Sequence, residues 1–224
     1  MNLPKKITPD NLIESIVEIR MNPILEQELW AGKMEYILGK SDWEYIPTSN
    51  TDDKIPFYGL FIKGDLRFTI NDKSVLFNCT LKKYIGWDSY RKEIRDVVEK
   101  ILKFPLAGAF SRVQIRYISE FENVNLCDCV NKNIVSCGDK FNCRGIRLDK
   151  SEDNTDIFIL LNNMPTNDGK TCSSFFDVNV FERFEATDSI EKLMKSLDNA
   201  HLKEKETFFA LLEDSFIEKL NPEY

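Results

Sequence analysis

Two short stretches about a hundred residues apart share one pattern of side chains. Residues 17–21 read VEIRM and residues 113–117 read VQIRY, and an arginine, Arg20 or Arg116, occupies the same place in each. Alternating apolar and polar residues indicate a half-buried strand, because successive side chains of a strand point to opposite faces of the sheet. Two strands with the same residue pattern, about a hundred residues apart in the sequence, predict that the chain contains two copies of one unit.

The elements that the pattern predicts follow the same order in both halves. The first half is expected to hold a strand at 12–21, a helix opened by Asn22-Pro23, strands near 43–47, 56–63, 66–71 and 75–84, and a helix that ends before Pro105 and Gly108. The second half is expected to hold a strand at 112–121, a short helix or loop at 122–137, strands at 142–149, 156–162 and 173–184, and one long helix or two up to residue 220. A helix is the main alternative at 12–21, but its β-branched residues favour a strand.

The last strand and the long helix of each half align at an offset of 100, which places Asp88-Ser89 over Asp188-Ser189. Asp88 and Asp188 are expected to cap these helices, and Glu191 completes a capping box. We therefore expect an α+β fold in one domain, 1–224, with pseudo-repeats at about 12–108 and 109–220. Pairing the halves edge to edge would give one antiparallel sheet with helices packed on one face. The alternative is chance, since many α+β domains begin a helix with Asp-Ser after a strand.

Composition restricts the class of protein. The chain has 224 residues, of which 42% are hydrophobic and 16 are Phe, enough to bury a sizeable core. Its net charge of -7 disfavours a general nucleic-acid-binding role, which needs a basic surface. The sequence has no apolar run typical of a signal peptide or a membrane span. We therefore expect no membrane association, a cytoplasmic location and six reduced cysteines rather than disulfides.

Few residues of the sequence suggest a catalytic role. The only histidine, His201, borders an apolar helical stripe between Leu197 and Phe208, which favours a packing or hydrogen-bonding role over a functional one. The sequence lacks the glycine-rich loops that bind phosphate and the G-x-S-x-G nucleophile motif. Catalysis is therefore the less favoured reading, and we expect no cofactor.

Four cysteines, Cys127, Cys129, Cys137 and Cys143, lie within seventeen residues. Zinc can accept four thiolates, but the spacing C-x-C-x7-C-x5-C contains no C-x2-C pair, which structural zinc sites usually present. The sequence therefore predicts no metal site, although it leaves zinc binding by these cysteines open.

Arg20 and Arg116 occupy equivalent places if the two halves are related. An arginine on a sheet surface can hold a carboxylate or a phosphate in a two-pronged contact. It can equally pair with a nearby Glu14, Glu18 or Glu120 as ordinary surface charge. We favour the ordinary pairing.

Five blocks of the sequence resemble an uncharacterised, sporadically distributed family of prokaryotic proteins. The blocks are LPKKITPDNLIESIVEIRMNPI, YIGWDSYRKEIRDVVEKIL, RVQIRYISEF, FDVNVF and LDNAHLKEKETFFALLEDSFIEKLNPEY. The shared positions are Glu18, Arg20, Tyr84, Trp87, Arg116, Tyr117, Asp177, His201, Phe208, Asn221 and Pro222. The cysteine-rich stretch at 127–143 departs from the family. The resemblance implies one fold over nearly the whole chain and a link to defence or toxin control, but no activity.

Our leading hypothesis is a non-enzymatic binding or assembly protein, with a protein partner or self-association. One alternative is a sensor that binds a small ligand in the crevice between the halves. Another is an enzyme acting on a phosphorylated or nucleic-acid substrate, with Arg20 and Arg116 as anion clamps. The candidate ligand-binding residues are Arg20, Arg116, Tyr117, Trp87 and His201.

Overall fold

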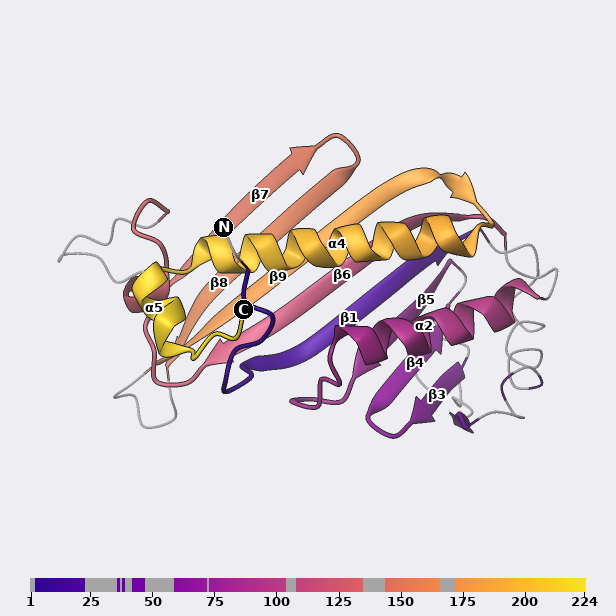
Figure 1. Ribbon diagram of the computed structural model, residues 1–224, viewed down its shortest axis with the longest axis horizontal. Helices are drawn as coiled ribbons and strands as arrows, with labels where there is room; N and C mark the ends of the chain where they lie inside the picture. Colours follow the sequence, from indigo (N-terminus) through magenta and orange to yellow (C-terminus); the bar gives the residue numbers. More distant parts are fainter. Residues whose placement is uncertain are drawn as a thin grey trace.

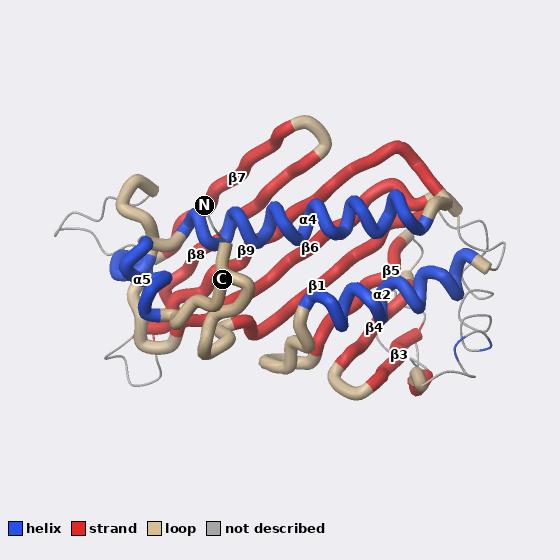
Figure 2. Tube along the Cα trace, viewed as in Figure 1, coloured by secondary structure: helices blue, strands red, loops and turns tan. Residues whose placement is uncertain are grey.

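A large antiparallel sheet dominates the protein, which confirms the α+β class (Figure 2). The computed structural model describes residues 3–22, 36, 38, 42–46, 59–71, 73–103, 108–134, 144–165 and 172–224. Its nine strands follow the order β2-β3-β4-β5-β1-β6-β9-β8-β7, and the paired strands are antiparallel. The strands are β1 (Leu12–Met21), β2 (Glu44–Ile46), β3 (Gly59–Lys63), β4 (Leu66–Ile70), β5 (Ser74–Cys79), β6 (Phe110–Phe121), β7 (Gly145–Glu152), β8 (Thr155–Pro165) and β9 (Cys172–Thr187).

The helices of the described residues are α2 (Trp87–Leu102), α3 (Leu126–Cys129), α4 (Ile190–Leu211) and α5 (Asp214–Lys219). The C-terminal region therefore forms two helices, one of the two outcomes that its pattern allowed. The predicted helix that follows Asn22 lies outside the described residues, as do positions 56–58 of a predicted strand.

The two stretches that share the VxIR pattern lie side by side at the centre of the sheet. In the β1–β6 pair Val17 is opposite Ile115 and Ile19 is opposite Val113. These four side chains are completely buried, whereas the residues between them are only half buried. The alternation read from the sequence therefore separates a buried face of the sheet from an open face.

Helices α2 and α4 lie in front of the sheet in Figure 1 and cover its buried face. Helix α4 contacts β6 and β9, and it also contacts α2. Each helix buries an apolar stripe: Tyr90, Ile94, Val97, Val98 and Ile101 in α2, and Leu193, Met194, Leu197, Ala200, Phe208, Phe209 and Leu211 in α4. Burial of these stripes against the sheet is the main stabilising contribution to this layer.

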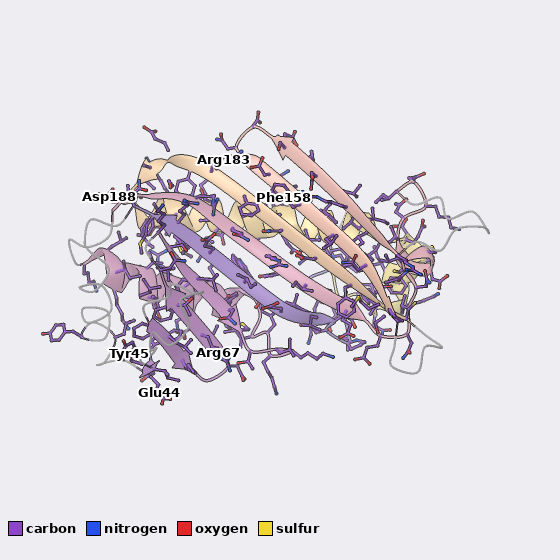
Figure 3. The ribbon with its side chains drawn as sticks, turned by 180° about the vertical axis from the view of Figure 1, so that it is seen from behind. Glu44, Tyr45, Arg67, Phe158, Arg183 and Asp188 are labelled. Carbon is purple, nitrogen blue, oxygen red and sulfur yellow. The ribbon has the colours of Figure 1, made fainter. Side chains whose placement is uncertain are left out.

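The opposite face of the sheet carries no described helix and mixes charged with apolar side chains (Figure 3). Arg112 pairs with Glu18 at 2.9 Å, and its guanidinium lies over the ring of Phe181. Phe158, labelled in Figure 3, contacts Phe181 edge to face and remains 39% exposed. Single exposed aromatic residues are common on protein surfaces, so this face alone does not define a site.

The chain leaves the sheet earlier after β5 than the sequence predicts. The strand expected to reach residue 84 ends at Cys79, because Thr80 begins a turn in which Lys82 has a φ of 57°. Gly86 follows with a φ of 85°, a left-handed conformation that costs glycine little. This turn brings Tyr84 and Trp87 to the helix side of the sheet.

The predicted caps of both long helices are wrong. Gly86, which has no side chain to form a cap, precedes α2, so Asp88 lies inside the first turn. Helix α4 begins one residue later than predicted, because the side chain of Ser189 rather than Asp188 accepts the hydrogen bond from the Lys192 N–H. The two helices therefore lack the matched cap on which part of the duplication argument rested.

Glu191, predicted to complete the capping box, accepts a hydrogen bond from Arg95 instead. Arg95 lies on α2 and also bonds Glu99 one turn further along at 2.7 Å. The carboxylate of Glu191 therefore joins the two long helices rather than capping its own, and the pKa of Glu191 is lowered mainly by this hydrogen bond.

Candidate functional site

A half-enclosed cavity of about 750 Å³ lies on the helix side of the sheet, between the start of α2 and the middle of α4. Strand β6 contributes its floor, and residues 4–12 contribute a third wall. Hydrogen bonds hold this N-terminal segment against the C-terminal end of the chain: the Thr8 N–H donates to the Leu220 carbonyl at 2.8 Å, and the Glu223 N–H donates to the Lys6 carbonyl at 2.9 Å. Figure 1 shows the two ends of the chain close together in front of the sheet.

Two tyrosines form a polar part of the cavity wall. Tyr117 points from β6 toward the helices and is 7% exposed, and Tyr84 comes from the turn after β5. Their hydroxyl oxygens are 2.9 Å apart and share one hydrogen bond. Burial raises the pKa of both phenols well above 10, so both remain neutral proton donors and acceptors.

Trp87, the first residue of α2, stacks on His201 of α4 with ring centroids 4.1 Å apart and an interplanar angle of 14°. The Trp87 Nε1–H donates to Asp198 Oδ1 at 3.3 Å. Arg91 donates two further hydrogen bonds to the same carboxylate, at 2.6 and 2.8 Å. Asp198 therefore fixes the indole, and the rings of His201 and Tyr117 pack edge to face with centroids 5.8 Å apart.

His201 has a ring nitrogen that lacks a partner. Its Nδ1 is buried and makes no hydrogen bond in the described part of the chain. The pKa of His201 is lowered to about 4, mainly by burial and also by the positive charge of Lys205, while Asp198 opposes both. The imidazole is therefore neutral at pH ~7, with one nitrogen that accepts a hydrogen bond and one that donates.

Glu204 lies one turn after His201 on α4, lines the cavity and is only 4% exposed. Its carboxyl group makes no hydrogen bond or ion pair with any residue that the structure describes. The pKa of Glu204 is raised to about 8, because burial raises it by more than the positive charge of Lys205 lowers it. Without a partner the side chain is therefore mostly protonated at neutral pH.

The structure brings together three of the five predicted site residues. Trp87, Tyr117 and His201 line the cavity, whereas Arg20 and Arg116 lie on the open face of the sheet. Because neighbouring residues of a strand point to opposite faces, Arg116 and Tyr117 cannot share one site. Arg116 instead holds the Asp177 carboxylate with two hydrogen bonds, at 2.9 and 2.7 Å. The sequence had suggested Glu14, Glu18 or Glu120 as the carboxylate partner, not Asp177.

Sequence reasoning missed Glu204, although a signal was present. In the sequence Glu204 follows His201 by three residues and precedes Phe208 by four, so it falls on the apolar stripe of its helix. An acidic residue on a stripe that must be buried is unusual and indicates a special role. Tyr84 reaches the cavity because β5 ends early, at Cys79, and no pattern in the sequence predicted that end.

The expectation of six reduced cysteines is wrong at Cys127, which is disulfide-bonded. Its partner is none of the other described cysteines, because Cys79, Cys129 and Cys172 carry free thiols. The expectation rested on the inferred compartment, which does not show which sulfurs the fold brings together. Cys137 and Cys143 lie outside the described residues.

Within the described ranges, no three His, Cys, Asp or Glu residues are grouped so that they could hold a metal ion. None of the described helices is both long enough and apolar enough to cross a membrane.

No family model matches the chain, and a comparison with curated proteins found no match. The fold and the site therefore define only a class, an α+β protein with a half-enclosed polar and aromatic cavity. The resemblance to a sporadic prokaryotic family stays a prediction.

Proposed function

We propose that this protein binds a small molecule in the cavity between α2 and α4 and does not transform it. One observation carries the proposal: Glu204 is 4% exposed, lines the cavity beside His201, and its carboxyl group has no partner among the described residues. A buried polar group without a hydrogen bond costs about 1–3 kcal/mol. A ligand that pairs with the Glu204 carboxyl recovers this cost on binding.

The surroundings of His201 favour binding over catalysis. A general base needs a group that orients it and a nucleophile within hydrogen-bond reach. His201 makes no hydrogen bond to a described residue, and its low pKa of about 4 makes it a weak base at pH ~7. The arginine-clamp alternative is also weakened, because Arg116 is already paired with Asp177 and lies on the other face of the sheet.

We further propose that the chain is a duplication and that the cavity lies between its halves. The strand order supports this: β5, β4 and β3 follow outward from β1, as β9, β8 and β7 follow outward from β6. Each series is followed by a long helix, α2 or α4, and the cavity lies where the first helix begins beside the second. Ligand sites are common at such junctions. A protein partner, self-association, a cytoplasmic location and a link to defence or toxin control stay predictions.

The indole of Trp87 provides a test. A library of charged, neutral and aromatic fragments is added to the ¹⁵N-labelled chain, and the Nε1–H resonances are assigned with tryptophan-to-phenylalanine variants. Trp43 is an internal control, because it is 5% exposed and packs against Phe68 in another part of the core. Fragments that bind in the cavity are expected to move the Trp87 resonance and leave that of Trp43 in place. A library in which no compound moves Trp87 alone would contradict the proposal.

A further inference from the structure

We propose that the ligand is an organic amine whose ammonium group pairs with Glu204, enclosed by Tyr84, Tyr117 and the stacked Trp87–His201 pair. This inference rests on the proposed function and names the chemical class of the ligand.

The first argument is the carboxyl group itself. Glu204 is only 4% exposed, lines the cavity and has no partner among the described residues. An isolated ionised carboxylate is costly in such a place, whereas one paired with a cation is not. An ammonium group supplies both the charge and the hydrogen-bond donors that Glu204 lacks.

The second argument is the number of acceptors. A primary ammonium has three N–H donors. The cavity offers the two oxygens of the Glu204 carboxylate and the lone pairs of the Tyr84–Tyr117 hydroxyl pair. These acceptors match the three donors without requiring any described side chain to lose a hydrogen bond.

The third argument is the aromatic lining. Tyr84, Trp87, Tyr117 and Phe208 all line the cavity, and the faces of aromatic rings carry partial negative charge. A cation over such faces gains about 0.5–2 kcal/mol, and the gain is larger where water is excluded. An anion in the same place would meet the rings with the opposite preference.

The charged residues of the lining do not reverse this preference. Lys5 and Lys6 come from the N-terminal segment and Lys205 from α4, and they are matched by Asp10, Asp88 and an ionised Glu204. Once an ammonium ionises Glu204, three positive and three negative side chains leave no large net charge of either sign in the lining. The sign of the ligand is therefore decided by Glu204, the one buried charged residue among the described residues of the lining.

The pairing has a measurable consequence for protons. The pKa of Glu204 is about 8 in the free protein, so an ammonium that ionises it releases a proton at neutral pH. Apparent affinity follows the fraction of Glu204 that is ionised, so it rises about eightfold between pH ~6.5 and pH ~7.5. Facing groups that titrate well outside this range, the Tyr84 and Tyr117 phenols and His201, contribute little to the change.

Three probes of similar shape test the inference: 2-phenylethylamine, 2-phenylethanol and 3-phenylpropanoate. Each is titrated into the full chain by calorimetry in two buffers of different ionisation enthalpy, with the Trp87 indole resonance as the readout of location. We expect the amine to bind in the cavity, to release protons and to bind about eightfold more tightly at pH ~7.5 than at pH ~6.5. The Glu204→Gln variant is expected to bind it at least about tenfold more weakly, since a charge-assisted pair is lost.

Glu206→Gln is the matched control, because Glu206 lies on the same helix, is 46% exposed and pairs only with Lys203 among the described residues. It should bind the amine as the wild type does. Tighter binding of the alcohol or the carboxylate at Trp87 would overturn the amine inference and leave the proposed cavity function standing. Amine binding without proton release would also overturn it, and this readout needs no variant. Failure of all three probes to move Trp87 would overturn it as well, and the fragment library then decides the proposed function separately.

Discussion

Replacing Glu204 with Gln should change how the stability of the protein depends on pH. The pKa of this carboxyl rises from 4.5 in the unfolded chain to about 8 in the fold, because burial disfavours its charge. Between these values the folded state binds more protons than the unfolded state, so its stability falls as pH rises. Glutamine resembles the protonated acid in shape but does not titrate, so the variant lacks this loss.

The magnitude follows from the two pKa values. Each tenfold change in proton affinity corresponds to about 1.4 kcal/mol, so wild type loses about 4 kcal/mol relative to Glu204→Gln between pH ~4.5 and pH ~8. Because Glu204 is 4% exposed, solvent screens its charge little. His201 titrates in both proteins, so its contribution largely cancels in the difference.

Urea unfolding of both proteins, followed by circular dichroism at several pH values between about 5 and about 9, measures this difference. The Glu206→Gln variant should show a pH dependence parallel to that of the wild type, since its carboxylate is exposed. A wild-type-minus-Glu204→Gln difference that varies by less than about 1 kcal/mol over this range would refute the reasoning. Glu204 would then reach water or a partner, and the argument for a ligand there would fail.

Three other outcomes are expected. His201 is the only histidine, so its imidazole can be titrated by NMR without overlap, and the midpoint should lie near the lowered pKa of about 4. The stability of the protein should then fall as the pH drops from about 6.5 to about 4. A midpoint near 6.5 would place His201 in solvent. Tyr84→Phe and Tyr117→Phe should each cost about 1–3 kcal/mol by leaving the other hydroxyl unpaired, and the double variant should cost less than their sum; simple additivity in urea unfolding would contradict the shared hydrogen bond. Arg116→Gln should cost about 1 kcal/mol or less, because Arg116 is partly exposed, and should leave the Trp87 resonance unshifted; a shift would link the open face to the cavity.

The sequence predicted the centre of the fold well because its signal is periodic. The alternation in residues 12–21 and 112–121 predicted β1 and β6 closely, although Arg116 and Tyr117, which this alternation places on opposite faces, were named as candidates for one site. The helix starts were predicted less well. Asp88 is a good capping residue by type, but the positive φ of Gly86 begins α2 before it, and a backbone angle is not visible in residue type alone.

The candidate site was only partly predictable, since it is assembled from distant segments. Trp87 and His201 were named because they match a family resemblance, yet only the packing of α2 against α4 shows that they stack. Arg20 and Arg116 were named as a possible anion-binding pair because their strands look alike, although ordinary pairing with carboxylates was favoured. That likeness instead placed both on the face away from the cavity, where Arg116 satisfies Asp177. Residue type identified the candidate side chains, but the alternation of side chains along each strand decided which of them lie on the same face of the sheet.

The most direct test of the account is the titration of the Glu204 carboxyl carbon by NMR, in protein labelled with ¹³C-glutamate and assigned with Glu204→Gln. The account predicts a midpoint near pH ~8 in the free protein and a lower midpoint in the presence of saturating 2-phenylethylamine. A midpoint near 4.5 in the free protein, or one that the amine does not move, would contradict it.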